Sequence, residues 1–314
     1  MVIVGGGFAG LWAVRALARA PVDVLLVDRR NYHTFLPLLY QVAASEVEPE
    51  AIAYPIRSIL RAIPNGRFLM AEVETLDPAA RLLVTTAGRI SYDALILAVG
   101  SVPQYFDLPG AREFAFPLKT LEEGVALRNH ILSCFERAAH AATAAARRAA
   151  LTFVIIGGGP TGVEFAGALA ELVWGPLRRD HPTFRPDEVR VVLIEAMAAL
   201  LPGLPERLSH YAAARLRRMR VDVYLGAAVT RVTPAEVALA DGTVIPTETV
   251  VWTAGVRGDP RAEAWGLPVR RGGRVGVLPT LQVPGHPEVY VAGDLAFVER
   301  DGRPLPQIAP VAIQ

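Results

Sequence analysis

Two glycine-rich turns, each between a short apolar strand and a helix pattern, constrain this chain more than any other feature. The first follows the apolar residues 2–4 and places Gly5, Gly7 and Gly10 at the spacing GxGxxG. In a strand–turn–helix unit, the first glycine permits the tight turn, the second lets the backbone approach a pyrophosphate, and the third lets helix and strand pack closely. The start of the helix attracts phosphate through its free N–H groups. The segment predicts a dinucleotide-binding unit.

An acidic residue completes this first pattern. The next apolar strand, residues 22–27, ends at Asp28, 18 residues after Gly10. A carboxylate at the carboxyl end of this strand can accept hydrogen bonds from both hydroxyls of an adenosine ribose. Glycine-rich turns also serve plain backbone geometry, so GxGxxG alone is weak evidence. Strand, helix, second strand and terminal acid together favour nucleotide binding.

The same arrangement returns in mid-chain. A buried-strand pattern over 152–156 leads into Gly157, Gly159 and Gly162, and a helix of small residues follows over 163–169. A simple dehydrogenase needs one such unit. Two bound dinucleotides indicate electron transfer between them, most simply between NAD(P)H and FAD. The alternative is that one of the two units is a relic without a ligand.

The acid of the second unit is expected at Glu195. It ends the strand 189–194, whereas Asp187 and Glu188 precede that strand and lie at the wrong end for a ribose. A carboxylate there accepts from a 2′-hydroxyl and repels a 2′-phosphate, which predicts NADH over NADPH. Arg185 and Arg190 are close in sequence and moderate this expectation.

Several longer strings resemble a known family. They are YDALILAVG at 92–100, VVWTAG at 250–255, VYVAGD at 289–294, RNYH at 30–33, PLLYQVA at 37–43 and GGGPTGVEFAGALAEL at 157–172. The chain resembles the flavoproteins with two dinucleotide-binding domains, and most closely the type II NADH dehydrogenases (NADH:quinone oxidoreductases). The resemblance implies an α/β fold of two Rossmann-like dinucleotide-binding domains, with the NAD domain inserted in a discontinuous FAD domain. It places FAD on residues 1–116 plus 277–314 and NADH on 117–276, with a helical insertion near 121–150.

The resemblance also assigns residues to each ligand. FAD contacts are expected at Gly5, Gly7, Gly10, Asp28, Arg29, Val73, Gly100, Gly293, Asp294, Pro310 and Val311. NADH contacts are expected at Gly157, Gly159, Gly162, Glu164, Glu195 and Gly255. On the quinone side it implies Pro37, Leu38 and Gln314.

Some of these residues have a plainer alternative. Glu164, two residues after Gly162, is the expected catalytic side chain through nicotinamide placement or proton handling, but an acid in a first turn can simply complement the helix dipole. Pro310 suits the start of a helix aimed at the reduced flavin, or marks only a helix start. For His33, a surface position is favoured over one near the adenosine. Thr120 and Glu123 form a capping-box pattern beside Lys119, the only lysine.

The implied reaction is hydride transfer from NADH to FAD and then two-electron transfer to a quinone. The alternatives are a soluble NADH-dependent flavoprotein reductase for a protein carrier or other acceptor, and an interaction protein that senses flavin or NADH. The family reaches the membrane through a C-terminal anchoring region after the flavin-facing helix, and this sequence stops at Gln314. We therefore expect a cytoplasmic enzyme, peripheral on the cytoplasmic face of the membrane when full length. A homodimer is compatible with this expectation.

Composition excludes several other classes. Cys134 is the only cysteine, so neither a redox cysteine pair, as in glutathione-reductase-like enzymes, nor the two cysteines of a sulfide:quinone oxidoreductase is present. No metal-ligand spacing appears, so no metal is expected. The 32 basic and 31 acidic residues leave a net charge of +1, which predicts no nucleic-acid partner. Stretches without charge, such as residues 31–45, are too short to span a bilayer.

Overall fold

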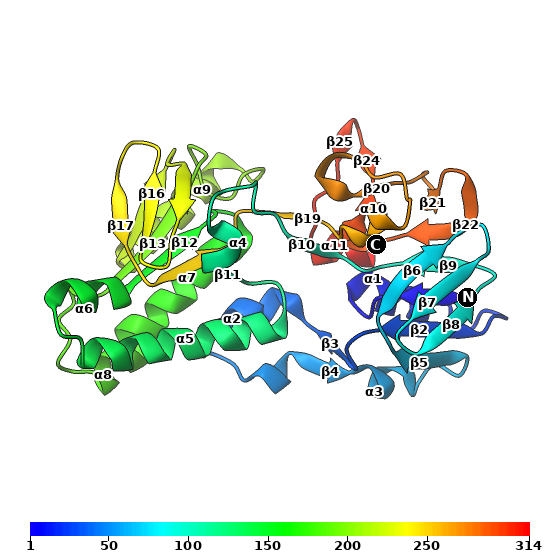
Figure 1. Cartoon of the computed structure of the whole chain (residues 1–314), viewed down its shortest axis with the longest axis horizontal. Coiled ribbons are helices and arrows are strands. Elements are labelled where there is room, and N and C mark those ends of the chain that lie inside the picture. The colour runs from blue at the N-terminus through cyan, green and yellow to red at the C-terminus, as the bar shows by residue number, and fades with distance from the viewer. The chain divides into compact units, whose positions relative to one another are not determined.

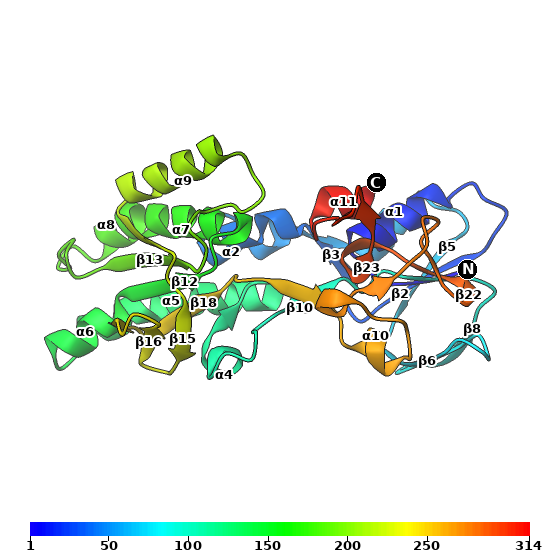
Figure 2. The same cartoon turned by 90° about the horizontal axis from the view of Figure 1, so that it is seen from above.

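The computed structural model describes all 314 residues and divides into two compact units, which Figures 1 and 2 show as ribbons. The first unit comprises residues 1–35, 53–102 and 256–314, and the second comprises 36–52 and 103–255. Each unit is built on a mainly or wholly parallel sheet, as the α/β expectation requires.

The sheet of the first unit has six strands in the order β21-β22-β9-β1-β2-β5. Strands β22, β9, β1, β2 and β5 run parallel, and β21 is an antiparallel edge strand. Its helices and strands are β1 Val2–Val4, α1 Phe8–Ala16, β2 Val24–Asp28, β3 Tyr32–Thr34, β4 Ala53–Pro55, α3 Ile56–Leu60, β5 Gly66–Met70, β6 Val73–Asp77, β7 Leu82–Thr85, β8 Gly88–Ser91, β9 Leu95–Leu97, β10 Ser101–Pro103, β19 Val256–Gly258, α10 Arg261–Ala264, β20 Val275–Gly276, β21 Gln282–Val283, β22 His286–Val291, β23 Ala296–Phe297, β24 Glu299–Arg300, β25 Arg303–Pro304 and α11 Ala309–Ile313.

The sheet of the second unit has five strands, all parallel, in the order β11-β18-β12-β13-β14. Its helices and strands are α2 Leu39–Ala43, α4 Ala111–Phe114, β11 Phe116–Pro117, α5 Leu121–Ala139, α6 Ala144–Ala150, β12 Thr152–Ile156, α7 Pro160–Leu172, α8 Arg178–Asp180, β13 Arg190–Glu195, α9 Glu206–Arg218, β14 Val221–Leu225, β15 Val229–Val232, β16 Glu236–Leu239, β17 Val244–Pro246 and β18 Thr249–Trp252. The helical segment expected near 121–150 forms α5 and α6.

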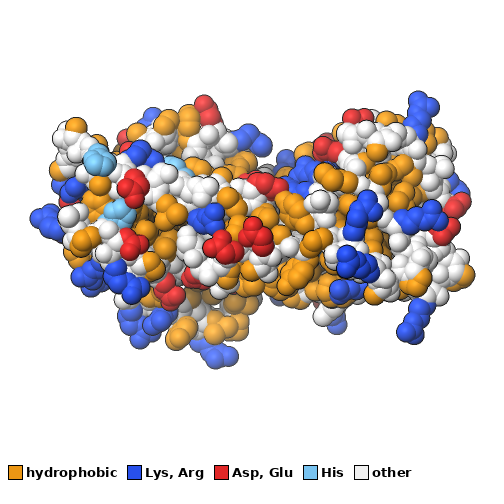
Figure 3. Space-filling view, turned by 90° about the horizontal axis from the view of Figure 1, so that it is seen from below, with side chains coloured by type: hydrophobic (Ala, Val, Ile, Leu, Met, Phe, Trp, Pro, Cys, Tyr) orange, Lys and Arg blue, Asp and Glu red, His pale blue; other side chains and the backbone are white.

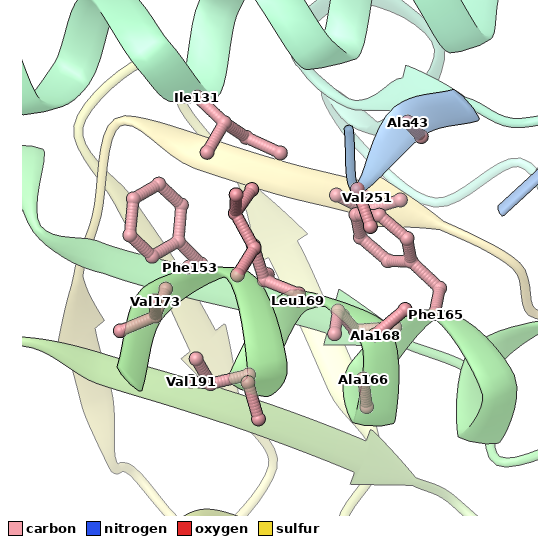
Figure 4. Close-up of a cluster of buried hydrophobic side chains, with 14 of the residues drawn as sticks. Ala43, Ile131, Phe153, Phe165, Ala166, Ala168, Leu169, Val173, Val191 and Val251 are labelled. Carbon is pink, nitrogen blue, oxygen red and sulfur yellow. The ribbon is translucent and has the colours of Figure 1, made fainter. Parts of the chain in front are cut away.

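The two faces of the second sheet carry different layers. Alternate strand residues point to opposite faces, so Phe153, Val191 and Val251 share a core with α2, α5 and α7 (Figure 4). Their neighbours, such as Val154 and Trp252, pack with the antiparallel strands β15–β17. The first unit repeats this plan, with α1 and α3 on one face and strands β6–β8 on the other. Both sheets are therefore covered on both faces, which explains their nearly continuous apolar strands.

The unit boundaries differ from those expected from the sequence, 1–116 plus 277–314 against 117–276. The segment 103–116 packs in the second unit, where Tyr105 shares a core with Trp252, whose Nε1 donates to the Gln104 carbonyl at 2.9 Å. Residues 256–276 belong to the first unit, because Trp265 and Val275 lie in its core and β20 pairs with β23. Sequence motifs mark where a nucleotide unit starts, whereas side-chain packing decides where it ends.

The expected capping box begins α5. The Thr120 hydroxyl accepts from the Glu123 N–H at 3.3 Å, and the Glu123 carboxylate accepts from the N–H groups of Thr120 at 2.9 Å and Lys119 at 2.8 Å. Cys134 is buried further along the same helix.

The substitution Thr120→Ala should lower the free energy of unfolding by about 1 kcal/mol, because the Glu123 N–H loses its side-chain acceptor. Urea unfolding followed by circular dichroism measures the change. Thr143→Ala is the matched control: Thr143 caps the short α6 through the Ala146 N–H alone. Each substitution removes one N-cap hydrogen bond, so losses of similar size are expected, and an unchanged free energy of unfolding in Thr120→Ala would contradict the cap.

Candidate functional site: two dinucleotide cradles

In the first glycine turn, two glycines are packed tightly against the backbone and one is free of neighbours. A side chain on Gly5, whose φ is +107°, would overlap the Ala98 carbonyl, and one on Gly10 would overlap the Gly5 carbonyl. A side chain on Gly7 would meet nothing within 4 Å. The geometry matches the roles expected from the sequence: Gly5 and Gly10 allow close packing, while Gly7 leaves the backbone accessible at the start of α1.

Two side chains hold the middle residue of this turn. The Asp28 carboxylate, at the end of β2, accepts from the Gly6 N–H at 2.5 Å and from the Arg30 N–H at 2.8 Å. His33 Nδ1 lies 3.0 Å from the Gly6 carbonyl oxygen. The expectation of a surface histidine was wrong: His33 is buried against Phe8, with ring centroids 5.0 Å apart, and burial lowers its pKa. We attribute this burial to the turn, because its carbonyl needs a partner.

The late Gly-Asp motif lies beside the first turn. A Cβ on Gly293, whose φ is +71°, would lie 2.9 Å from the Ala9 Cβ and 3.6 Å from the Ala312 Cβ, so α1 and α11 meet at this glycine. The Ser101 hydroxyl, next to Gly100, donates to the Asp294 carboxylate at 2.6 Å. The fold therefore gathers four expected FAD segments: the first turn, 100–101, 293–294, and α11 with Pro310 in its first turn and Val311 after it.

The remaining expected FAD residues, Arg29 and Val73, lie beside an ion-pair network that sequence reasoning missed. Glu72 accepts from Arg261 at 3.2 Å and lies 3.6 Å from Arg29. Arg261 also makes a bidentate pair with Asp259, at 3.0 and 2.6 Å. Burial acts against ionisation of Asp259, but the Arg261 hydrogen bonds and charge outweigh it and lower its pKa. No motif signals this network, because its partners are distant in the sequence.

The second turn repeats the first. Gly157, with φ +114°, allows the backbone to approach the Ala254 Cα, which would lie 2.6 Å from a side chain at this position. A side chain on Gly162 would overlap the Gly157 carbonyl, whereas one on Gly159 would meet nothing within 4 Å. Gly255, the last of the expected NADH residues, directly follows the turn at Thr253 and Ala254.

Glu195 occupies the place that Asp28 has in the first unit. It is buried at the end of β13, and its carboxylate accepts from the Gly158 N–H at 2.6 Å and the Met197 N–H at 2.7 Å. Each acid thus accepts from the N–H of the middle glycine of its own GGG run, Gly6 or Gly158. Each also accepts from the N–H of the residue two positions after itself. The two units are built alike at the atoms that would face an adenosine ribose.

Glu164 lies one turn further along the helix than expected. Helix α7 already begins at Pro160, and its first turn contains no acidic residue. The helix-dipole explanation for Glu164 is therefore weakened, because that effect fades beyond the first turn. Its side chain reaches solvent, yet partial burial raises its pKa. Burial, followed by the Glu164 charge, also raises the pKa of Tyr40 on α2, which packs on α7.

The residues expected on the quinone side fall in different units. Pro37 and Leu38 form a 3-10 turn, residues 36–38, that leads into α2 of the second unit. Gln314 follows α11 in the first unit. Their role in quinone binding stays a prediction.

The structure contains neither a metal-binding cluster nor a membrane-spanning helix. No group of three or more His, Cys, Asp or Glu side chains is placed to hold a metal ion. None of the helices is both long and apolar enough to cross a membrane. Basic and acidic side chains both appear on the face drawn in Figure 3, without a single basic field.

The open glycines test whether a dinucleotide would fit. At each turn the position that must approach a pyrophosphate is free of neighbours, while the positions on either side are tightly packed. Carboxylate oxygens of Asp28 and Glu195 stand at the matching strand ends. The residues present therefore fit a dinucleotide in each unit.

Comparison with known proteins agrees with this geometry. The family model for pyridine nucleotide-disulphide oxidoreductases matches residues 1–314. The type II NADH:quinone oxidoreductase Ndh of Mycobacterium tuberculosis is 40% identical over 326 residues, covering 100% of this chain and 70% of that protein. An external alternative NAD(P)H-ubiquinone oxidoreductase of Arabidopsis thaliana mitochondria, B2, is 30% identical, covering 96% of this chain and 54% of that protein.

A solved structure, NDH2 of Plasmodium falciparum in complex with NADH, has the same fold. Its TM-score is 0.88 at 22% identity, covering 94% of this chain and 64% of that one. The solved structure shows the fold, and the Mycobacterium relative, which is 40% identical and matches this chain throughout, shows the family. The chain belongs to the type II NADH:quinone oxidoreductases, within the pyridine nucleotide-disulphide oxidoreductases.

Proposed function

We propose that this chain is a flavoenzyme that oxidises NADH and reduces a quinone without pumping protons. The observation that carries the proposal is the pair of complete cradles, each with an open glycine and an acid bound to the turn. One cradle serves a dehydrogenase, whereas two let a resident FAD pass electrons on from NADH. The named relatives oxidise NADH or NAD(P)H and reduce quinones.

The chain's own residues would divide the work as follows. In the first unit, Gly7 and the start of α1 receive the FAD pyrophosphate, and Asp28 receives the adenosine ribose. Asp294 is set by Ser101 to bind the ribityl chain. In the second unit, Gly159 and Glu195 bind NADH in the same way. FAD, when bound, supplies the hydride and electron chemistry, while the protein orients the two nucleotides.

NADH should be preferred over NADPH because of what surrounds Glu195. The two arginines close to Glu195 in sequence are held elsewhere. Arg190 is at the opposite end of β13 and pairs with Asp222 at 2.8 Å. Arg185 pairs with Asp187 at 3.0 Å. The negative charge of a 2′-phosphate would therefore be repelled by the Glu195 carboxylate, and neither arginine would neutralise it.

The proposed electron acceptor, a quinone, implies contact with a membrane. A quinone dissolved in the bilayer requires the enzyme to work at the membrane surface, which we place on the cytoplasmic side, where NADH is available. A soluble reductase for a protein carrier is the second candidate. Reoxidation of the reduced flavin separates the two.

The first prediction concerns the reaction itself. Anaerobic NADH should bleach the flavin absorbance of the FAD-loaded protein, and a short-chain quinone should restore it, at about 1 s⁻¹ or faster. Stopped-flow absorbance measures both steps. Bleaching without reoxidation by ubiquinone or menaquinone analogues would rule out the quinone reductase and favour the protein-carrier candidate.

The second prediction concerns the nucleotide. Glu195→Ala removes the ribose acceptor and the repulsion of a 2′-phosphate, so the ratio of kcat/KM for NADH to that for NADPH should fall at least about tenfold. Steady-state rates with both nucleotides measure it. Asp180→Ala is the control, because this exposed acid on α8 is not part of the second glycine turn or of β13 and should leave the ratio unchanged. A wild-type rate with NADPH equal to that with NADH would contradict the role of Glu195.

The third prediction concerns Glu164. Burial raises the pKa of Glu164, so its carboxyl stays protonated to a higher pH than that of an ordinary glutamate. As the pH falls, Glu164 therefore loses its charge at a pH above the usual glutamate pKa. The pH profile of kcat/KM for NADH should show this titration, and Glu164→Gln should remove it and slow turnover about tenfold or more. The neutral glutamine should not destabilise the fold, since the fold already disfavours ionisation. Unchanged turnover and an unchanged profile would leave Glu164 without a catalytic role.

A further inference from the structure

Phe106 is exposed and held in a costly backbone conformation. Its side chain is 62% exposed, and its φ is +52°, followed by +53° at Asp107. Left-handed φ values at two consecutive residues other than glycine are unfavourable and persist only where the surrounding structure fixes them. Burial does not account for this ring, because most of it faces solvent. The conformation therefore presents an aromatic surface.

The segment that carries Phe106 is fixed to the end of β18. The Gln104 N–H donates to the Gly255 carbonyl at 3.0 Å, and the Gln104 carbonyl accepts from Trp252 Nε1 at 2.9 Å. The Phe106 ring lies against Gly255, since a Cβ on this glycine would be only 3.3 Å from the Phe106 Cζ. Gly255 itself has a φ of +152°. The missing side chain at 255 is what lets the ring approach the backbone.

This aromatic surface adjoins the second cradle. The Thr253 hydroxyl is 3.0 Å from the Gly157 carbonyl, its acceptor, so the turn 253–255 is bonded directly to the glycine turn. Strand β18 neighbours β12 on the side opposite β13, and Glu195 ends β13. A dinucleotide with its adenosine ribose on Glu195 and its pyrophosphate at Gly159 must extend its other half toward β18. That half is the nicotinamide nucleotide.

We propose that Phe106 binds the nicotinamide end of NADH, with its ring as an apolar platform beside Gly255. The proposal rests on the proposed function, because it takes NADH as the ligand of the second cradle. It goes further by placing a recognition surface on a residue outside every motif of the sequence. Aromatic rings recognise flat ligands through stacking or edge contacts, and the nicotinamide ring is such a ligand.

The test removes the ring and keeps the backbone. Asparagine adopts left-handed φ readily, so Phe106→Asn should fold with an unchanged thermal midpoint. Its Kd for NAD⁺, measured by isothermal titration calorimetry on the FAD-loaded protein, should rise about tenfold. Its Kd for ADP-ribose, which has the adenosine, pyrophosphate and second ribose but no nicotinamide, should change less than about twofold. Asp107→Asn keeps the ring and the neighbouring left-handed residue, so both constants should stay at the wild-type values.

Two results would overturn the inference while leaving the proposed function intact. One is an unchanged Kd for NAD⁺ in Phe106→Asn. The other is an equal loss of affinity for NAD⁺ and ADP-ribose, which would mean that the pyrophosphate cradle was disturbed. A wild-type protein that binds neither ligand would overturn the proposed function together with this inference, so the failures are distinguishable.

Discussion

A carboxylate bonded to the backbone of a glycine turn is the interaction on which both halves of this protein depend. Asp28 holds Gly6, and Glu195 holds Gly158, in each case across the gap between two neighbouring parallel strands. The bond orders the turn before any ligand arrives, so the entropy of the loop is lost on folding rather than on binding. Each carboxylate still has lone pairs for a ribose, because an ionised carboxyl offers about four acceptor directions. One side chain thus serves the fold and the ligand.

The pairing of closed and open glycines completes this arrangement. Gly10 and Gly162 allow the helix to lie against the carbonyl of the first glycine, which brings the helix start close to the strand end. Gly7 and Gly159 keep the space in front of that start free. Charge, shape and backbone donors therefore converge on one point in each unit, and the covered parallel sheets keep that point rigid.

Sequence reasoning was most successful where local chemistry decides the structure. The glycine spacing, the strand-ending acids and the capping box at Thr120 are local patterns, and the structure shows each in place. Sequence reasoning failed where contacts between residues distant in the chain determine the structure. His33 was expected at the surface and is buried, because it meets a carbonyl 27 residues away. The network of Glu72 and Arg261 spans 189 residues and has no sequence signature. The expected start of α7 was also late, although Pro160 stands at the first helical position, which proline favours, and could have marked the start.

The division of the chain has a consequence for how it folds. The first unit is made of three separate segments, and its sheet includes β22, residues His286–Val291, paired with β9 nearly 200 residues earlier. During synthesis this sheet stays incomplete until β22 has left the ribosome. Most of the second unit, residues 103–255, is continuous and emerges earlier, so it can acquire its core first. Until then β9 has an exposed edge, which makes the nascent first unit the part most dependent on chaperones.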